Sequence, residues 1–398
     1  LMFENLEELQ PDPILGLMAA HRNDASLRKI DLGVGVYRDE SGATPIMKSV
    51  LEAQKMRHET EQTKSYIGPP GTPEFNTLTR KLMFGNDNQA EKSNRIAGVQ
   101  TPGGCGALRV AAELIKRARP KTTIWVSDPT WANHQPLLGN VGLNLAEYAY
   151  YQKSSRSLNT EGLLESLSNV PAGDAVLIHG CCHNPSGVDL EPQHWEAIAD
   201  LAINQGFTPF IDLAYQGLGD SLEEDAMGVK ILSERCPEVI VASSYSKNFG
   251  LYRERVGSLQ IVSPNVAQTT IVQSQLGSVV RGIYSMPPAH GAAIVETILS
   301  DKTLKLQWVE ELSTMRDRIN LLRKELANRL TREIDQDFSF IEKQKGMFSF
   351  LGIDANQVAR LQTEFAIYMV DSSRINVAGV NNSNIDYFVE SMTTILKN

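Results

Sequence analysis

The chain has 398 residues, enough for two or three domains, and its 42% hydrophobic and 21% charged residues are typical of a globular protein. A formal net charge of −9 without a lysine or arginine run argues against nucleic-acid binding, and no apolar stretch approaches the roughly 18 residues of a membrane helix. The four cysteines, and a first segment in which no basic region precedes an apolar one, favour a cytoplasmic protein with reduced thiols.

The middle of the chain alternates short apolar runs with stretches of helical period. Runs rich in β-branched residues occupy 124–127, 175–179, 207–212 and 239–243, and amphipathic stretches separate them, at 107–119 and 193–205 for example. This alternation predicts an α/β fold with a mostly parallel sheet covered by helices on both faces. Because ligands of such sheets bind beyond the carboxyl ends of the strands, we expect the chemistry-bearing residues directly after the apolar runs.

The last part of the chain predicts a smaller unit. Apolar residues recur at steps of three and four from Leu312 to Leu330, which indicates one long amphipathic helix that spans two domains. Segments 338–341, 347–351 and 368–370 then have the pattern of strands in an α+β unit. The segment around 30–37 is too short to stand alone, so we expect it to join this unit.

Lys247 follows an apolar run and lies among small hydroxyl residues. Considered alone, it is most simply a solvated surface charge. The functional interpretation is a lysine that forms a Schiff base with an aldehyde cofactor, because partial desolvation lowers the pKa of an amine and makes it nucleophilic. Ser244 and Arg255 lie on either side of it in the sequence, and a hydroxyl with a guanidinium can hold a phosphate.

Asp212 ends another apolar run, and Asn184 begins an Asn-Pro-Ser-Gly turn after the run 175–179. A half-buried carboxylate needs a partner, which a protonated pyridine nitrogen can provide. Tyr215, three residues after Asp212, can reach a phenolate oxygen on the same ring, and the Asn184 amide can bond that oxygen. The simpler alternatives are an aspartate that caps a loop and a turn without function.

The segment 100–106 is a glycine-rich turn that opens a helix, and it includes Gly104 and Cys105. Such a turn offers free N–H groups and the positive end of a helix dipole to a phosphate. As a dinucleotide signal it is weak, because the G-x-G-x-x-G spacing is missing. Trp131 follows a further run and is either a core aromatic or a stacking partner for a planar ring.

Each of these signals is weak alone, but all of them fall at predicted strand ends. Together they fit an aldehyde-bearing, phosphorylated, aromatic nitrogen cofactor, which is pyridoxal 5'-phosphate. His134, His179 and His183 match no zinc spacing, so we expect no metal and assign them hydrogen-bonding roles.

The same residues lie in motifs that span nearly the whole chain. These motifs are Asp12-Pro-Ile-Leu-Gly, Leu32-Gly-Val-Gly-Val-Tyr, Thr101-Pro-Gly-Gly, Ser127-Asp-Pro-Thr-Trp, His179-Gly-Cys-Cys-His-Asn-Pro, Asp212-Leu-Ala-Tyr-Gln-Gly, Ser243-Ser-Tyr-Ser-Lys-Asn-Phe-Gly-Leu-Tyr and Arg374-Ile-Asn-Val-Ala-Gly. In this order they resemble the aspartate and aromatic aminotransferases of the fold-type-I pyridoxal-phosphate class. The resemblance implies a large domain with a mostly parallel seven-stranded sheet, a smaller α+β domain and an aminotransferase activity.

The resemblance also implies a role for each residue around the cofactor ring. Lys247 binds the cofactor aldehyde and later moves the proton between the substrate Cα and the cofactor. Asp212 pairs with the ring nitrogen, with support from His134 and His179. Trp131 stacks on the ring and borders the substrate.

The phosphate and the substrate have their own implied residues. The phosphate is held by Gly104, Cys105, Ser244 and Arg255, and by Tyr66 of the neighbouring subunit. Asn184 and Tyr215 bond the ring oxygen. Arg374 binds the substrate α-carboxylate near Gly35, and Arg281 reaches across a homodimer to a distal carboxylate.

The implied organisation is a homodimer with shared active sites. Residues 1–11 form an arm against the partner subunit, 12–45 and 315–398 form the small domain, and 46–314 form the large cofactor-binding domain. Two arginines for two carboxylates favour aspartate, glutamate and 2-oxoglutarate as substrates of a ping-pong reaction.

Some positions depart from the family pattern. Cys105 stands where the family usually has threonine or serine; a thiol donates weakly, but its backbone N–H remains. Ser186 replaces the usual threonine. Met286 is flexible and can admit aromatic substrates, whereas Val36 and Thr44 fit the aspartate-preferring pattern.

The alternative function is therefore an aromatic-amino-acid aminotransferase that retains dicarboxylate activity. A non-catalytic protein of this fold is disfavoured because none of the expected catalytic groups is missing. A nicotinamide dehydrogenase is disfavoured because the glycine turn has the wrong spacing and lies far from the N-terminus.

Overall fold

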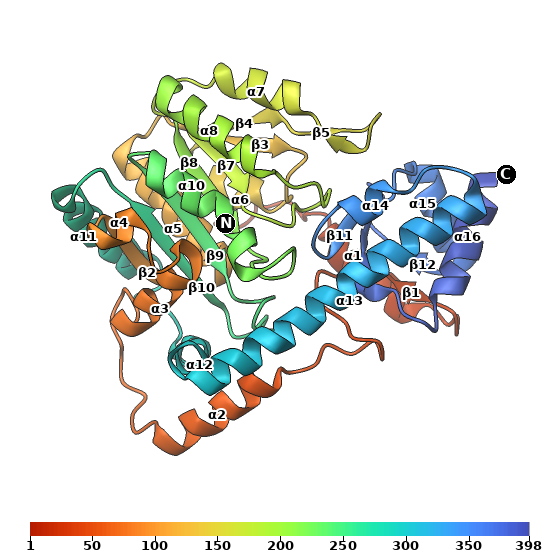
Figure 1. Ribbon diagram of the computed structural model, residues 1–398, viewed down its shortest axis with the longest axis horizontal. Coiled ribbons are helices and arrows are strands. Elements are labelled where there is room, and N and C mark those ends of the chain that lie inside the picture. The colour runs from red at the N-terminus through yellow and green to blue at the C-terminus, as the bar shows by residue number, and fades with distance from the viewer. Residues whose placement is uncertain (398) are drawn as a thin grey trace.

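The structure is a computed structural model that describes residues 1–397, and its centre is a seven-stranded sheet (Figure 1). In spatial order the strands are β2 (Ile96–Pro102), β10 (Val256–Val262), β9 (Val239–Ser244), β8 (Thr208–Leu213), β7 (Ala175–His179), β3 (Thr123–Asp128) and β4 (Asn144–Ala149). Strand β10 is antiparallel to both of its neighbours, and the other pairs are parallel. The predicted mostly parallel sheet is therefore confirmed.

Helices cover both faces of this sheet. They are α2 (Lys48–Thr60), α3 (Pro73–Phe84), α4 (Gln89–Lys92), α5 (Gly103–Ala118), α6 (His134–Gly139), α7 (Thr160–Ser168), α8 (Pro192–Gln205), α9 (Leu222–Asp225), α10 (Met227–Arg235), α11 (Val266–Ile283) and α12 (Ala289–Ser300). Successive side chains of β7 enter different cores: Val176 and Ile178 join side chains of α8 and α10, whereas Ala175 and Leu177 join those of α5 and α11. A strand buried on both faces is apolar throughout, which explains why the runs were readable in the sequence.

A smaller α+β unit has a core of its own. It contains α1 (Pro13–Asn23), β1 (Ile30–Asp31), α14 (Phe340–Lys343), β11 (Phe348–Phe350), α15 (Ala355–Phe365), β12 (Ile367–Tyr368), β13 (Arg374–Asn376), a 3₁₀ turn (Val377–Gly379) and α16 (Ile385–Lys397). Strand β1 pairs in parallel with β12, so the predicted joining of the N-terminal segment to this unit is confirmed. Strand β11 pairs with β13 in the antiparallel sense. The two-residue strands β5 (Tyr151–Gln152) and β6 (Ser157–Leu158) form a separate hairpin.

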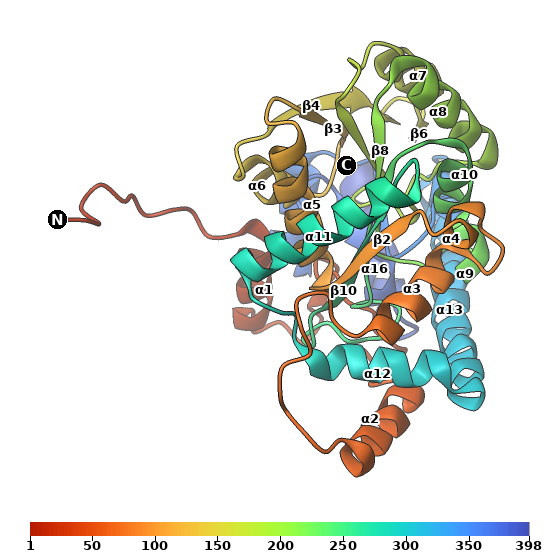
Figure 2. The ribbon, with the colours of Figure 1, turned by 90° about the vertical axis from the view of Figure 1, so that its left-hand side faces the viewer.

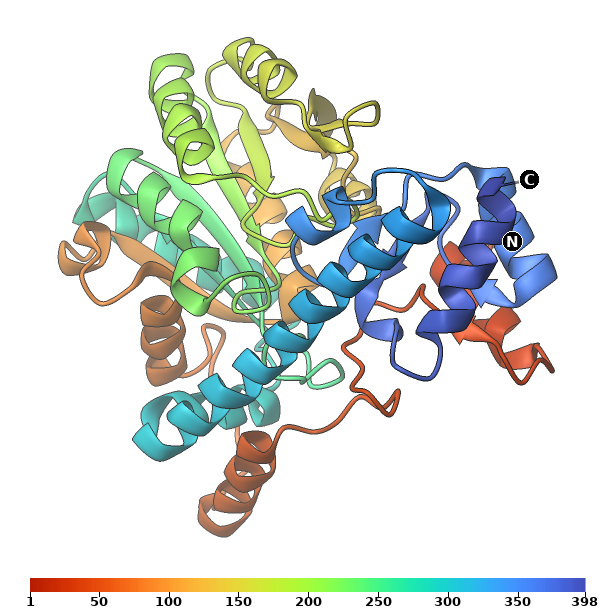
Figure 3. The same cartoon turned by 45° about the vertical axis from the view of Figure 1, so that its right-hand side comes forward.

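The predicted long helix is α13 (Lys302–Ile334), and it connects the two cores (Figure 3). Its buried apolar residues up to Ile319 pack in the same core of the large sheet as α8 and α10. Those from Leu322 onward pack in the core of the smaller unit. The change of core thus falls a few residues after the predicted boundary at 315. The ranges 12–45, 46–314 and 315–398 stay a proposal for the domains.

The prediction of a strand at 338–341 is wrong. This segment is a turn followed by the short helix α14. The Asp337 carboxylate accepts a hydrogen bond from the Ser339 N–H at 2.8 Å, and the Thr331 hydroxyl accepts one from the Phe338 N–H at 3.0 Å. Both bonds favour a turn, and the apolar spacing of the segment suits a helical turn as well as a strand.

The first residues extend away from the body of the molecule (Figure 2). Residues 1–13 are all exposed, and α1 buries none of its side chains. The role of 1–11 as an arm against a partner stays a prediction. None of the helices in the described part of the chain combines the length and the apolar character that crossing a bilayer requires.

Candidate active site

Most of the polar residues singled out in the sequence gather at the carboxyl ends of β3, β7, β8 and β9. His179 and Asp212 are register partners at the ends of β7 and β8. Lys247 lies three residues beyond the end of β9, and Trp131 three residues beyond the end of β3. Parallel strands with a common direction therefore bring residues from distant parts of the sequence to one edge of the sheet.

Asp212 is held by a line of hydrogen bonds. Its Oδ2 lies 2.7 Å from His134 Nε2, His134 Nδ1 lies 2.8 Å from the Thr130 hydroxyl, and that hydroxyl lies 2.9 Å from His179 Nε2. Burial raises the pKa of Asp212, but the hydrogen bond from His134 and nearby positive charge lower it overall. The carboxylate is thus ionised at neutral pH.

The line of bonds has one consistent direction. If His134 donates from Nε2 to Asp212, its Nδ1 is an acceptor for the Thr130 hydroxyl, whose oxygen then accepts from His179 Nε2–H. Burial lowers the pKa of His179 to about 3, with a contribution from His134. A neutral His179 therefore acts as the first donor of the line, and Thr130 fixes the tautomer of His134.

Lys247 is half-buried and lies above the face of Tyr215, with Nζ 4.9 Å from the ring centre. Burial lowers its pKa, while Asp212 and Cys105 act in the opposite direction. In residues 1–397 its ammonium group forms neither a hydrogen bond nor an ion pair. A lysine of this kind is poised to act as a nucleophile or a base.

The glycine-rich turn at the start of α5 brings together groups that can hold an anion. No side chain caps this 16-residue helix, so its first N–H groups are free of a side-chain partner. A Cβ on Gly103 would lie 2.4 Å from the guanidinium of Arg255, and a Cβ on Gly104 would lie 3.1 Å from Ser244 Cβ. The absence of side chains here lets the helix end, a hydroxyl and a guanidinium converge.

Cys105 is half-buried within this turn, where its sulfur accepts a hydrogen bond from the Asn133 amide at 3.7 Å. Burial raises the pKa of its thiol, although Arg255 and Lys247 counteract part of the effect. The side chain is therefore a neutral thiol, and the backbone N–H is the stronger donor at this position.

Arg374 lies in β13 and is nearly enclosed. Its Nη1 donates to Asn184 Oδ1 at 3.1 Å and its Nη2 donates to the carbonyl of Gly33 at 2.9 Å. The guanidinium carbon lies 4.2 Å from the centre of the Phe348 ring. Its Nε has no hydrogen-bond partner, and no carboxylate pairs with it in the described chain. A buried cation without an anion is a candidate binding group.

The segment around Gly35 is fixed against the same strand. The Asn376 amide donates to the carbonyls of Val34 and Val36 at 2.6 and 2.7 Å. A Cβ on Gly35 would lie 3.3 Å from the Phe348 ring. The backbone at 33–36 therefore passes directly beside Arg374 and its supporting ring.

Tyr215, Trp131 and Asn184 each contact another residue of the cluster. Tyr215 is buried and meets Phe348 edge-on, with ring centres 6.1 Å apart. Trp131 meets His134 edge-on at 5.3 Å. Asn184 is connected to the cluster through Arg374.

Two predicted residues are not brought into the cluster within one chain. Tyr66 is 90% exposed, and Arg281 is exposed near the end of α11, where its guanidinium bonds the Ser285 hydroxyl. Their contribution from a neighbouring subunit stays a prediction. Sequence reasoning gave no role to Thr130 and Phe348. The spacing of four residues between Thr130 and His134 was the available signal for Thr130.

The fold is of the α/β class, and the cluster combines a half-buried lysine with an uncapped helix start beside Ser244 and Arg255. The model of the family described as aminotransferase class I and II matches residues 28–392. An aspartate aminotransferase of Haemophilus influenzae is 46% identical over 99% of this chain and 100% of its own length, and an aromatic-amino-acid aminotransferase of Pseudomonas aeruginosa is 43% identical over 99% and 98%. The chain belongs to the aminotransferase class I and II family.

A solved structure gives the same result for the fold. The aromatic-amino-acid aminotransferase of Burkholderia pseudomallei, which is covalently bound to pyridoxal phosphate, has a TM-score of 0.98 and 39% identity, with 99% of each chain covered. The predicted fold class is confirmed.

Proposed function

We propose that this protein transfers the amino group of aspartate to 2-oxoglutarate in a ping-pong reaction, with pyridoxal 5'-phosphate bound at Lys247. The observation that carries the proposal is a pair of cations that have no anionic partner among residues 1–397. Lys247 lies over Tyr215, and Arg374 packs on the ring that Tyr215 meets edge-on. One cation suits an aldehyde and the other a carboxylate.

The residues present fit the cofactor at three places. Asp212 Oδ1 accepts no hydrogen bond from any residue in 1–397, so it can pair with a protonated ring nitrogen. The start of α5, Ser244 and Arg255 supply donors for the phosphate. Within the described part of the chain, Lys247 Nζ has no competing partner. Trp131 and Tyr215 would border the ring, and Asn184 would bond its oxygen.

When bound, the cofactor supplies an aldehyde for the substrate amine and a cationic ring that withdraws electrons from the substrate Cα. The chain does the rest. Lys247 would take the proton from the substrate Cα and deliver it to the carbon of the cofactor aldehyde. Asp212 stays ionised through His134 and keeps the ring nitrogen protonated. Arg374 orients the α-carboxylate by its planar fork.

The distal carboxylate of aspartate needs a second cation. We assign it to Arg281 of a second copy of this chain, with Tyr66 of that copy at the phosphate. Exposure of both residues supports a homodimer, as does the exposure of five apolar side chains in the arm: Leu1, Met2, Phe3, Leu6 and Leu9. Four free cysteines support the cytoplasm as its location.

The test is a single-turnover experiment on the cofactor-loaded protein. Aspartate and phenylalanine are added separately without a keto acid, and the absorbance of the lysine-bound cofactor is followed. We expect much faster loss of that absorbance with aspartate. Lys247→Ala should lack both the absorbance and turnover, and substantial amino transfer by this variant would refute the role of the lysine.

Arg281→Leu separates the two substrates. If Arg281 binds the distal carboxylate, the variant loses rate with aspartate but not with phenylalanine. The second candidate function is an aromatic-amino-acid aminotransferase. It is favoured by Met286, a flexible half-buried residue whose sulfur accepts a hydrogen bond from the Ile67 N–H at 3.4 Å. Conversion with phenylalanine that equals or exceeds conversion with aspartate would establish this alternative.

A further inference from the structure

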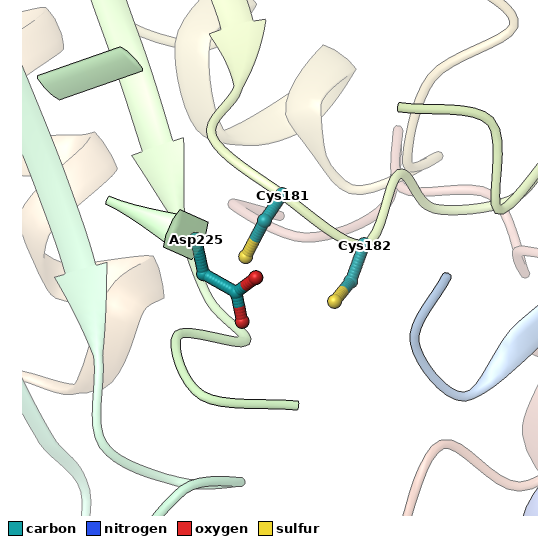
Figure 4. Close-up of side chains that lie close together, drawn as sticks. All are labelled: Cys181, Cys182 and Asp225. Atoms are coloured by element: carbon teal, nitrogen blue, oxygen red, sulfur yellow. The ribbon is translucent and has the colours of Figure 1, made fainter. Parts of the chain in front are cut away.

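Two buried thiols lie next to the candidate active site, in the loop that carries Asn184. Cys181 and Cys182 are adjacent in the loop that leads from β7 to Asn184, and both are buried free thiols. The carboxylate of Asp225, at the end of α9, faces them (Figure 4). One ligand atom from each of the three side chains lies within 4.8 Å of the other two. Two sulfurs and a carboxylate oxygen are ligands that zinc and its heavier relatives prefer.

The carboxylate is already held in place by its own loop. Asp225 Oδ2 accepts hydrogen bonds from the N–H groups of Gly217 and Gly219 at 2.8 and 2.9 Å, and Oδ1 accepts one from Asp220 at 2.9 Å. A carboxylate oxygen has room for two partners, so Oδ1 keeps one free. Hydrogen bonds of this kind orient a ligating carboxylate and stiffen its position.

The buried guanidinium of Arg323 lies near Cys182. The guanidinium of Arg323 donates two hydrogen bonds to the carbonyl of Gly346, and a Cβ on Gly346 would lie 2.9 Å from Cys182 Sγ. In residues 1–397 Arg323 has no carboxylate within ion-pair distance. Two thiolates and one carboxylate around a divalent cation have a net charge of −1, which this guanidinium offsets.

We propose that Cys181, Cys182 and Asp225 bind one soft divalent cation, such as Zn²⁺ or Cd²⁺. Two S–H bonds break, both protons leave to solvent, and two metal–sulfur bonds form with one metal–oxygen bond, so that no oxidant or reductant takes part. With metal–sulfur bonds of about 2.3 Å, the sulfurs of a tetrahedral site lie about 3.8 Å apart. This spacing lies within the extent of the cluster.

The site is coupled to the active-site loops. The carboxylate of Asp189 accepts hydrogen bonds from the N–H groups of Cys182 and His183 at 2.7 and 2.8 Å, directly before Asn184. Cys182 Sγ lies 4.0 Å from the carbonyl of Tyr215. A metal bound to Cys182 would shift the two loops that carry Asn184 and Tyr215. We therefore expect metal binding to inhibit the enzyme. This inhibition, unlike the binding, rests on the proposed function.

Binding is measured on the cofactor-loaded protein with CdCl₂ alone. Equilibrium dialysis with metal analysis should give one Cd²⁺ per chain, together with the ultraviolet charge-transfer absorbance of cadmium–thiolate bonds. The release of two protons per cation, followed in a weakly buffered solution, is a readout that needs no variant. These measurements do not depend on amino transfer, so they distinguish failure of the metal site from failure of the proposed function.

Cys181→Ser and Cys182→Ser should each weaken binding at least tenfold, because loss of even an outer-shell partner costs roughly 10–100-fold in metal affinity. Cys236→Ser is the matched control, since Cys236 is a buried free thiol outside the cluster. It should bind Cd²⁺ as the unchanged protein does. The proposal is overturned if no Cd²⁺ is retained, if fewer than two protons are released, or if the double variant Cys181→Ser/Cys182→Ser still binds one equivalent.

Discussion

Thr130 connects two buried imidazoles, and its replacement by valine tests whether that connection stabilises the candidate active site. The hydroxyl bonds His134 Nδ1 at 2.8 Å and His179 Nε2 at 2.9 Å. Valine preserves the branched shape of the side chain and removes both bonds. In the direction deduced above, His134 is left with an unpaired acceptor and His179 with an unpaired donor.

The size of the effect follows from the two unpaired groups. A buried polar group without a partner costs about 1–3 kcal/mol, so two of them destabilise the fold by about 2–6 kcal/mol. At about 2.1 cal/mol/K per residue, the unfolding entropy of 398 residues is about 0.8 kcal/mol/K. The melting temperature should therefore fall by about 2–7 °C.

The assay is thermal unfolding of Thr130→Val, followed by circular dichroism at one fixed protein concentration and one cofactor concentration. Thr130→Ser is the control, because serine keeps the hydroxyl and loses only a methyl group. It should melt close to the unchanged protein. Equal melting temperatures for the valine and serine variants would refute the assignment of a stabilising line of hydrogen bonds.

Three further predictions concern charged or chargeable groups. Arg374→Lys keeps the charge but loses the planar fork, so kcat/KM for aspartate should fall about 10²–10³-fold with unchanged circular dichroism, and a loss below threefold would contradict the assigned role. Burial lowers the pKa of His179 from 6.5 to about 3. Between pH 6.5 and pH 3, His179 therefore binds a proton in the unfolded chain but not in the folded chain. The stability that His179 contributes is complete above pH 6.5 and declines as the pH falls towards 3. Urea unfolding should give a lower free energy of unfolding at pH 5 than at pH 7, and His179→Asn should make this difference smaller. Arg323→Met leaves three buried carbonyls without their donor, so the melting temperature should fall by about 4 °C or more, whereas an unchanged value would show that the guanidinium is not needed for stability.

The sheet was predictable because its strands are buried on both faces. The runs 175–179 and 239–243 are apolar up to their last residue, and each lies in a central strand. Parallel pairing then explains why Asp212 and His179 end side by side although 33 positions separate them in the chain. The position of the candidate site could be predicted from these ends alone, since ligands of parallel sheets bind there.

Other features could not be predicted from local patterns. The pattern of segment 338–341 fits a strand and a helical turn equally well. The hydrogen bonds that Thr331 and Asp337 accept from the N–H groups of Phe338 and Ser339 favour the turn. Thr130 acquires its role only when β3 and β7 bring His134 and His179 to opposite sides of one hydroxyl. Such roles depend on contacts between distant elements, which periodicity does not encode.

Arg323 and Arg374 show most clearly why function needs contacts as well as motifs. Both are arginines in the interior, 1% and 8% exposed, and neither forms an ion pair in residues 1–397. A guanidinium has five N–H donors. Arg323 makes five hydrogen bonds, four to the carbonyls of Ile341, Gly346 and Phe348 and one to Ser349, so it is saturated.

Arg374 makes only two hydrogen bonds, to Asn184 and to the Gly33 carbonyl, and its Nε is buried without a partner. Three donors of a desolvated cation are thus left for an incoming anion, and burial lowers the pKa of this arginine accordingly. All five donors of Arg323 thus have partners within the fold, whereas Arg374 keeps donors that a bound carboxylate would satisfy. A buried charge with unpaired donors is typical of a ligand-binding residue, so it supports the proposal that Arg374 binds the substrate carboxylate, independently of the motif in which it lies.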